Sequence, residues 1–142
     1  MSLTETRFSQ TQTFNKDILG IEPRLRNLLP KNEYSLSYTQ LMEEANEFLE
    51  AAEKADYIGC VDAIIDNLYF AYGILYKLGL DESDINSLFS LVHHANMMKR
   101  MGVKPGREGH GNAADAVKPS EWVDPRKLME QYFDATSHAY NN

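Results

Sequence analysis

The amino-acid sequence predicts an all-α protein, arranged as an antiparallel bundle of four to five helices. Apolar residues recur at spacings of three and four along several segments, which is the period of a helix with one buried face. Residues that typically start and stop helices flank these segments. No segment shows the alternation of apolar and polar residues that is typical of a half-buried strand.

The length and composition predict one globular domain that spans residues 1–142. Apolar residues make up 43% and charged residues 25% of the chain, which is typical of a folded protein. The formal net charge of −7 argues against nucleic acid as a partner, because nucleic-acid-binding proteins usually carry a basic surface. A single cysteine, Cys60, cannot form an internal disulfide, so we expect a reducing, cytoplasmic location.

No membrane partner is expected either. Asp62 and Asp66 interrupt the longest apolar stretch, which leaves no uninterrupted run of about 18 apolar residues. The N-terminal residues are polar and show no signal-peptide pattern.

The first half of the chain predicts three helices. Residues 1–20 read as a short helix, and prolines at 23 and 30 mark the connection that follows. Ser37 and Gln40 match a capping box, which predicts a second helix from about residue 38 to Lys54. Asp56 and Gly79 are the expected start and stop residues of a third, strongly apolar helix.

The second half predicts two further helices separated by a loop. The first helix runs from about Glu82 to Met101 and ends at Gly102, with Lys99 in its last turn. Residues 103–120 are rich in Gly, Pro, Lys and Asn and predict an irregular loop. Asp124 and the proline after it predict the start of a final helix that reaches residue 133.

Two aspartates lie within the most apolar predicted helix. Asp62 and Asp66 are four residues apart, which places them about 40° apart on one face of a helix. A helix that is apolar on nearly all sides is normally buried, and a buried carboxylate needs a partner. This aspartate pair therefore points to a functional group nearby.

The preceding helix carries glutamates at helical spacing. Glu43, Glu44 and Glu47 lie opposite its apolar stripe, so a solvated acidic face is one interpretation. The short connection makes the two helices antiparallel neighbours, so the glutamates can instead face Asp62 and Asp66. Each pair of carboxylates then repels by about 3 kcal/mol at ~6 Å, and a divalent cation relieves this repulsion. Oxygen ligands suit Mg²⁺, Mn²⁺ or Ca²⁺.

A di-iron site is disfavoured, because it needs a Glu-x-x-His pattern. Neither His93 nor His94 has a glutamate three residues before it. Asn96 and Lys99 continue the apolar stripe of their helix, so they either contact a phosphate or base or form a fraying helix end.

Four segments together resemble the all-α nucleoside triphosphate pyrophosphohydrolases of the MazG-like superfamily. The resemblance is to its phosphoribosyl-ATP pyrophosphohydrolase-like branch in particular, and it covers roughly residues 36–125. The Glu-Glu-x-x-Glu motif is weak alone, but its combination with the aspartate helix, Asn-x-x-Lys and Lys-Pro is fairly specific. The four segments are Leu41–Phe48, Val61–Tyr69, Val92–Arg100 and Ala116–Trp122.

The resemblance implies a role for each matched residue. Glu44 and Glu47 match the first metal motif of the family and Asp66 matches the second. Asp62 replaces a glutamate that the family usually has at the position of Ala63. The remaining matches imply nucleotide contacts by Asn96 and Lys99, a phosphate contact by Lys118, and a water-orienting or basic role for Glu43.

The activity implied is hydrolysis of an NTP or dNTP, standard or not, at the α–β phosphate bond. Mg²⁺ is the implied cofactor, with Mn²⁺ as a substitute, and the implied assembly is a homodimer or homotetramer. Two other functions stay open at this point. One is a non-catalytic helical module that binds a nucleotide or metal for regulation, and the other is a purely structural helical dimer.

Overall fold

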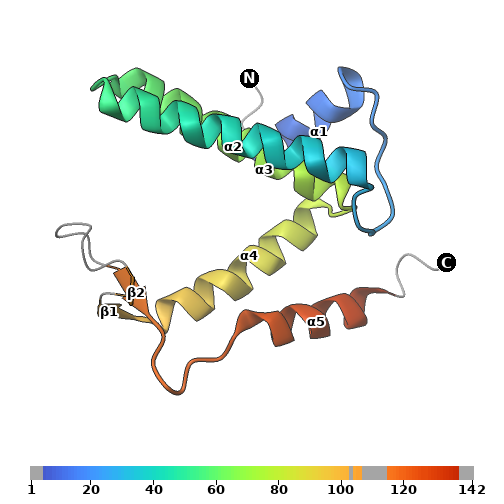
Figure 1. Cartoon of the computed structure of the whole chain (residues 1–142). Helices are drawn as coiled ribbons and strands as arrows, with labels where there is room; N and C mark the ends of the chain where they lie inside the picture. Colours follow the sequence, from blue (N-terminus) through green and yellow to red (C-terminus); the bar gives the residue numbers. More distant parts are fainter. Residues whose placement is uncertain (1–4, 103, 107–114, 138–142) are drawn as a thin grey trace. The chain divides into compact units, whose positions relative to one another are not determined.

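The computed structural model describes residues 5–102, 104–106 and 115–137, which form five helices and one two-stranded sheet (Figure 1). This confirms the all-α class. The helices are α1 (Arg7–Asp17), α2 (Lys31–Glu53), α3 (Tyr57–Lys77), α4 (Glu82–Met97) and α5 (Pro125–Thr136). The strands are β1 (Arg100–Gly102) and β2 (Asp115–Val117).

The chain divides into two compact units, Met1–Glu82 and Ser83–Asn142. The expectation of a single domain over residues 1–142 stays a prediction.

The first unit is a hairpin of two long helices with α1 packed on one of them. α2 and α3 run side by side in opposite directions, joined by a short turn (Figure 1). α1 packs on α3, where Gly73 allows a close approach: a Cβ there would lie 3.4 Å from the Asn15 side-chain nitrogen. The Tyr76 hydroxyl donates to the Ile21 carbonyl at 2.7 Å, which fastens the segment after α1 to α3.

The predicted start of α2 at Ser37 is wrong. The helix begins seven residues earlier, at Lys31 after the N-cap residue Pro30. Proline fixes a suitable φ at a helix start and lacks the N–H that would otherwise need a partner. Ser37 lies inside the helix with 4% of its surface exposed, so its hydroxyl caps nothing. Residues 31–36, which were expected to precede the helix, therefore belong to α2.

The predicted ends of α3 are confirmed. Asp56 is the N-cap, and its carboxylate accepts from the Gly59 N–H at 3.0 Å. Gly79 follows the helix with φ +87°, a conformation that L side chains rarely adopt. A Cβ at this position would also lie 2.5 Å from the Arg26 backbone nitrogen. Both the backbone conformation and the close packing therefore require glycine.

α3 remains largely uncovered in the chain. Among the described residues it is the one helix long and apolar enough to cross a membrane, by length and composition alone. Only 11% of its most apolar window is buried inside the chain. Core helices of soluble proteins meet the same criterion, so the expectation of no membrane partner stays a prediction.

The second unit joins α4 to α5 through the small sheet. α4 ends at Met97, so Lys99 lies beyond the helix and not in its last turn as predicted. β1 and β2 pair antiparallel with Arg100 opposite Val117, which replaces part of the loop expected at 103–120. Asp124 caps α5 as predicted, accepting from the Arg126 N–H at 2.9 Å.

The ion pair at the start of α2 makes stability depend on pH. Both Arg24 terminal nitrogens donate to the Glu33 carboxylate, at 2.6 and 2.7 Å, and hydrogen bonding to Arg24 lowers the pKa of Glu33. Ionised Glu33 therefore stabilises the fold above the ordinary carboxyl pKa, and this contribution is lost as the pH falls through the lowered value.

We predict that Glu33→Gln lowers the free energy of unfolding at pH 7 by up to about 1 kcal/mol, because the pair is partly exposed. The difference from wild type should shrink as the pH falls below the ordinary carboxyl pKa, as measured by urea unfolding. Glu53→Gln, at the other end of α2, is the control. A deficit that persists unchanged at low pH would contradict the assignment.

Candidate functional site

The acidic residues predicted from the sequence lie on the two packed helices of the first unit. α2 carries Glu43, Glu44 and Glu47, and α3 carries Asp62 and Asp66. The Asp56 cap reverses the chain within a short turn, so α3 returns along α2 and their side chains adjoin. The expected antiparallel neighbours are therefore present.

Glu44 is the member of this acidic group that is turned inward. Its Oε2 atom is shielded from solvent and has no hydrogen-bond partner within the described residues. Burial raises the pKa of the Glu44 carboxyl, and the negative charges of Glu47 and Asp66 raise it further. The charge of Asp62 acts in the same direction. A buried acceptor surrounded by negative charge is stabilised by a proton or by a cation.

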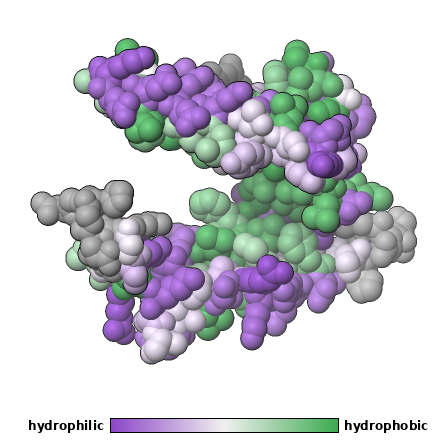
Figure 2. Space-filling view, in the orientation of Figure 1, coloured by the Kyte–Doolittle hydropathy of each residue, from purple (hydrophilic) through white to green (hydrophobic). Residues whose placement is uncertain are grey.

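The other acidic side chains are more accessible to solvent. Glu43, Glu47 and Asp62 are exposed and Asp66 is half-buried, and the outward surface of α2 is largely hydrophilic (Figure 2). In the described part of the chain, no three Asp, Glu, His or Cys side chains come close enough together to hold a metal ion. The structure thus places four carboxylates within electrostatic range of one another, but not around a common point.

The unpartnered Glu44 oxygen fits a divalent cation chemically. Carboxylate oxygens are the preferred ligands of hard cations such as Mg²⁺. The negative charges of Glu47, Asp62 and Asp66 all act on Glu44, so a cation beside it would be stabilised by all four carboxylates. The assignment of Glu44, Glu47, Asp62 and Asp66 as metal ligands stays a prediction.

The predicted basic residues lie in the second unit, where the small sheet brings two of them together. The register that pairs Arg100 with Val117 places Lys99 opposite Lys118, one position further along. Their ammonium nitrogens lie 5.5 and 4.5 Å from the centre of the Trp122 ring. Asn96 is exposed near the end of α4, and its carbonyl accepts from the Lys99 N–H at 3.1 Å.

Trp122 is a residue that the sequence reasoning did not single out as functional. Its indole N–H donates to the Ala95 carbonyl at 2.7 Å, so the ring is fixed against the end of α4. A ring fixed in this way is a cation–π partner for both lysines. The signal in the sequence was weak: a single tryptophan four residues after Lys118.

The two lysines differ from their basic neighbours in the sheet. Arg100 contacts Glu121 at 3.3 Å and Lys104 contacts Asp115 at 3.8 Å. Within the described residues, Lys99 and Lys118 contact the Trp122 indole and form no ion pair with a carboxylate. Two ammonium groups beside the same ring repel each other, so an anion between them would be stabilising. The lysine pair can therefore accept a phosphate group.

A family model described as phosphoribosyl-ATP pyrophosphohydrolase matches residues 21–96, more than half of the chain. The chain belongs to the phosphoribosyl-ATP pyrophosphohydrolase family. The match includes α2, α3 and nearly all of α4, and therefore the whole acidic group. α1, the sheet and Trp122 lie outside it. No curated protein matches the chain.

Membership confirms the resemblance found in the sequence and assigns the reaction class. Proteins of the phosphoribosyl-ATP pyrophosphohydrolase family are pyrophosphohydrolases, which hydrolyse acid anhydrides, and they typically depend on a divalent metal.

The raised pKa of Glu44 predicts a change in stability when its charge is removed. A carboxyl whose pKa is higher in the folded state destabilises the fold as the pH rises from the ordinary carboxyl pKa through the raised value. Glu44→Gln should therefore raise the melting temperature of the metal-free protein at pH 8 by about 3 °C. The gain should disappear near about pH 4, where wild-type Glu44 is protonated.

Thermal unfolding in EDTA at the two pH values checks this prediction. Glu43→Gln is the matched control, because its side chain is exposed on the same helix. An equal melting temperature for Glu44→Gln and wild type at pH 8 would show that Glu44 carries no electrostatic penalty.

Proposed function

We propose that this chain is a metal-dependent nucleoside triphosphate pyrophosphohydrolase. It would cleave an NTP or dNTP, including non-standard nucleotides, between the α and β phosphorus atoms to give the monophosphate and pyrophosphate. The observation that supports this best is the buried, unpartnered Glu44 oxygen beside three further carboxylates, in a chain of a pyrophosphohydrolase family.

Glu44, Glu47, Asp62 and Asp66 are the proposed ligands of Mg²⁺, for which Mn²⁺ can substitute. When bound, such an ion neutralises negative charge on the triphosphate and polarises the phosphoryl group under attack. The chain has a net charge of −7, and its acidic group repels an unaccompanied triphosphate. Both substrate binding and catalysis at this surface would therefore depend on the cation.

Glu43 is the proposed water-handling residue. It is exposed on α2 next to Glu44, so its carboxylate can accept a proton from a water molecule at the edge of the acidic group. Attack of the water oxygen on phosphorus forms a new P–O bond and breaks the α–β anhydride. The pyrophosphate leaves with the electron pair of the broken bond.

The lysine pair is proposed to bind phosphate groups. Lys99 and Lys118 lie next to the paired ends of the two strands and share the Trp122 ring. Because their side chains are already restricted, binding an anion would cost them little conformational entropy. Asn96, exposed at the end of α4, is also proposed to contact the substrate. These assignments concern the second unit alone.

The proposed assembly is a homodimer or homotetramer in the cytoplasm. α3 exposes large apolar side chains that water solvates poorly, including Ile58 at 79% and Ile64 at 45% exposure. Large exposed apolar surfaces usually mark an interaction site, and a second copy of the chain would bury this one. Neither nucleic acid nor a membrane is proposed as a partner.

A pyrophosphate-release assay over a panel of NTPs, dNTPs and phosphoribosyl-ATP, with and without Mg²⁺, tests the proposed reaction. We expect turnover of at least one nucleotide only with metal, and a loss of about 100-fold or more in Asp66→Asn. Asp17→Asn, an exposed aspartate at the end of α1, is the control. Folded protein that binds nucleotides but releases no pyrophosphate would favour a non-catalytic regulatory module.

The lysine pair gives a separate, spectroscopic prediction. Because Trp122 is the one tryptophan, its fluorescence should change when inorganic pyrophosphate binds between the lysines. Lys118→Gln should weaken this binding by about tenfold, since a charge-assisted contact is lost. Lys127→Gln, an exposed lysine on α5, should bind as wild type does. Equal affinities for Lys118→Gln and wild type would exclude Lys118 from the anion site.

A further inference from the structure

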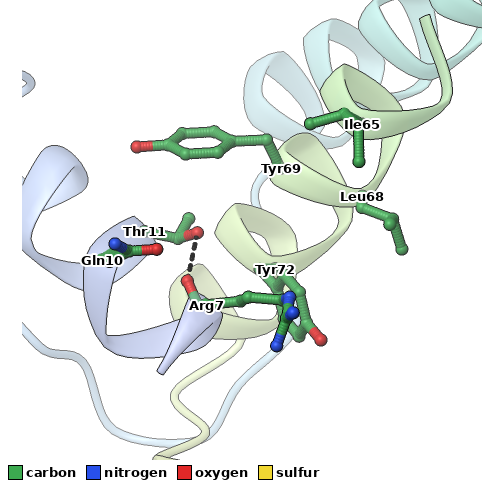
Figure 3. A pocket seen from close by; sticks show the side chains of 7 residues that line it. All are labelled: Arg7, Gln10, Thr11, Ile65, Leu68, Tyr69 and Tyr72. Atoms are coloured by element: carbon green, nitrogen blue, oxygen red, sulfur yellow. Dashed lines mark hydrogen bonds between the residues drawn. The ribbon is translucent and has the colours of Figure 1, made fainter. Parts of the chain in front are cut away.

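We infer that a pocket between α1 and α3 binds the base of the nucleotide and sets the base preference of the chain. This inference rests on the proposed function, because it names the part of the substrate that the pocket would recognise. The pocket has a volume of about 160 Å³, small enough to suit one planar ring system (Figure 3). Its walls are Arg7, Gln10 and Thr11 from α1 and Ile65, Leu68, Tyr69 and Tyr72 from α3.

Two tyrosines on α3 form the aromatic side of the pocket. Tyr69 and Tyr72 are three residues apart, and each is supported by a phenylalanine of α1. The Phe14 and Tyr69 rings meet edge to face at 5.5 Å, and the Phe8 and Tyr72 rings lie 6.1 Å apart. Because these contacts fix both rings, the pocket offers aromatic surface to a planar ligand at little cost in conformational entropy.

α1 supplies the polar side of the pocket. Within the described residues, the Arg7 guanidinium and the Gln10 amide have no hydrogen-bond partner. The Thr11 hydroxyl is already committed, since it donates to the Arg7 carbonyl at 3.0 Å (Figure 3). A guanidinium fork and an amide with both donor and acceptor are the groups that read the edge of a nucleobase. Aromatic faces together with such edge-reading groups favour a base over an aliphatic ligand.

The position of the pocket along α3 suits a nucleotide whose phosphates lie at the acidic group. Asp66 precedes Tyr69 by three residues and Tyr72 by six on the same helix. With a rise of about 1.5 Å per residue, Tyr72 lies about 9 Å beyond Asp66 along the helix axis. A ribose bridges a gap of that order between a base and its phosphates. One nucleotide can therefore reach both sites within the first unit.

The α1 wall of the pocket precedes the part of the chain that the family model matches. α1 lies outside residues 21–96, the part that the family model matches. The acidic group and the α3 side of the pocket lie inside the match, whereas Arg7, Gln10 and Thr11 precede it.

Binding of nucleoside monophosphates in EDTA, followed by NMR shifts of the α1 amides, tests the inference without requiring turnover. We expect at least one of AMP, GMP, CMP, UMP and dTMP to bind, and Arg7→Ala and Gln10→Ala to weaken it about tenfold. Tyr69→Leu, which removes a ring, should weaken it similarly. Lys16→Ala and Gln12→Ala are matched controls on α1 that do not line the pocket, and they should bind as wild type does.

The outcomes separate this inference from the proposed reaction. Monophosphate binding that depends on Arg7 and Gln10, without turnover of any triphosphate, would support the pocket and overturn the reaction. Turnover with base preferences that Arg7→Ala and Gln10→Ala leave unchanged would overturn the pocket. If these two variants instead change the oligomeric state and leave monophosphate binding unaltered, the pocket is a subunit contact and the inference is wrong.

Discussion

The structure of the first unit depends on a conflict between packing and charge at Glu44. The antiparallel packing of α2 on α3 shields one oxygen of this carboxylate and provides no hydrogen bond for it. The same packing surrounds it with the charges of Glu47, Asp62 and Asp66, which raise its pKa together with burial. A hairpin selected for stability alone would place an apolar side chain here. The free-energy cost of this arrangement is therefore best explained by a ligand that needs the charge, and the family supplies one in a divalent cation.

α3 connects this acidic group to the rest of the first unit. One side of the helix adjoins α2 and carries the two aspartates, while the next side contacts α1 through Gly73 and the tyrosine pair. Most of the remaining surface is apolar and exposed. A single helix thus presents metal ligands, a proposed base pocket and a proposed subunit interface at successive positions around its axis. The second unit contributes a different chemistry, in which a short sheet and a fixed indole hold two lysines together.

Much of this arrangement could be predicted from the sequence, for identifiable reasons. The Asp56 cap, Gly79 and the Asp124-Pro125 pair are local signals whose chemistry does not depend on distant residues, and all three are confirmed. The false start at Ser37 arose because a matching capping pattern lies within a longer helix that Pro30 begins. β1 and β2 have three residues each, too few for alternation to be recognised. Cross-strand placement of Lys99 and Lys118 over Trp122 depends on that register, so sequence alone could not give it. The acidic residues were recognised by spacing, but the inward turn of Glu44 is a property of the packing.

Direct titration of the metal-free protein with Mn²⁺, followed by electron paramagnetic resonance, tests the central claim that the acidic group holds a divalent cation. The signal of free Mn²⁺ should fall as the ion binds, and Mg²⁺ should compete for the same site. Glu44→Gln should abolish this binding, whereas Glu53→Gln, an exposed glutamate at the end of the same helix, should leave it intact. Wild-type protein that binds no Mn²⁺, with or without a nucleotide present, would contradict the account.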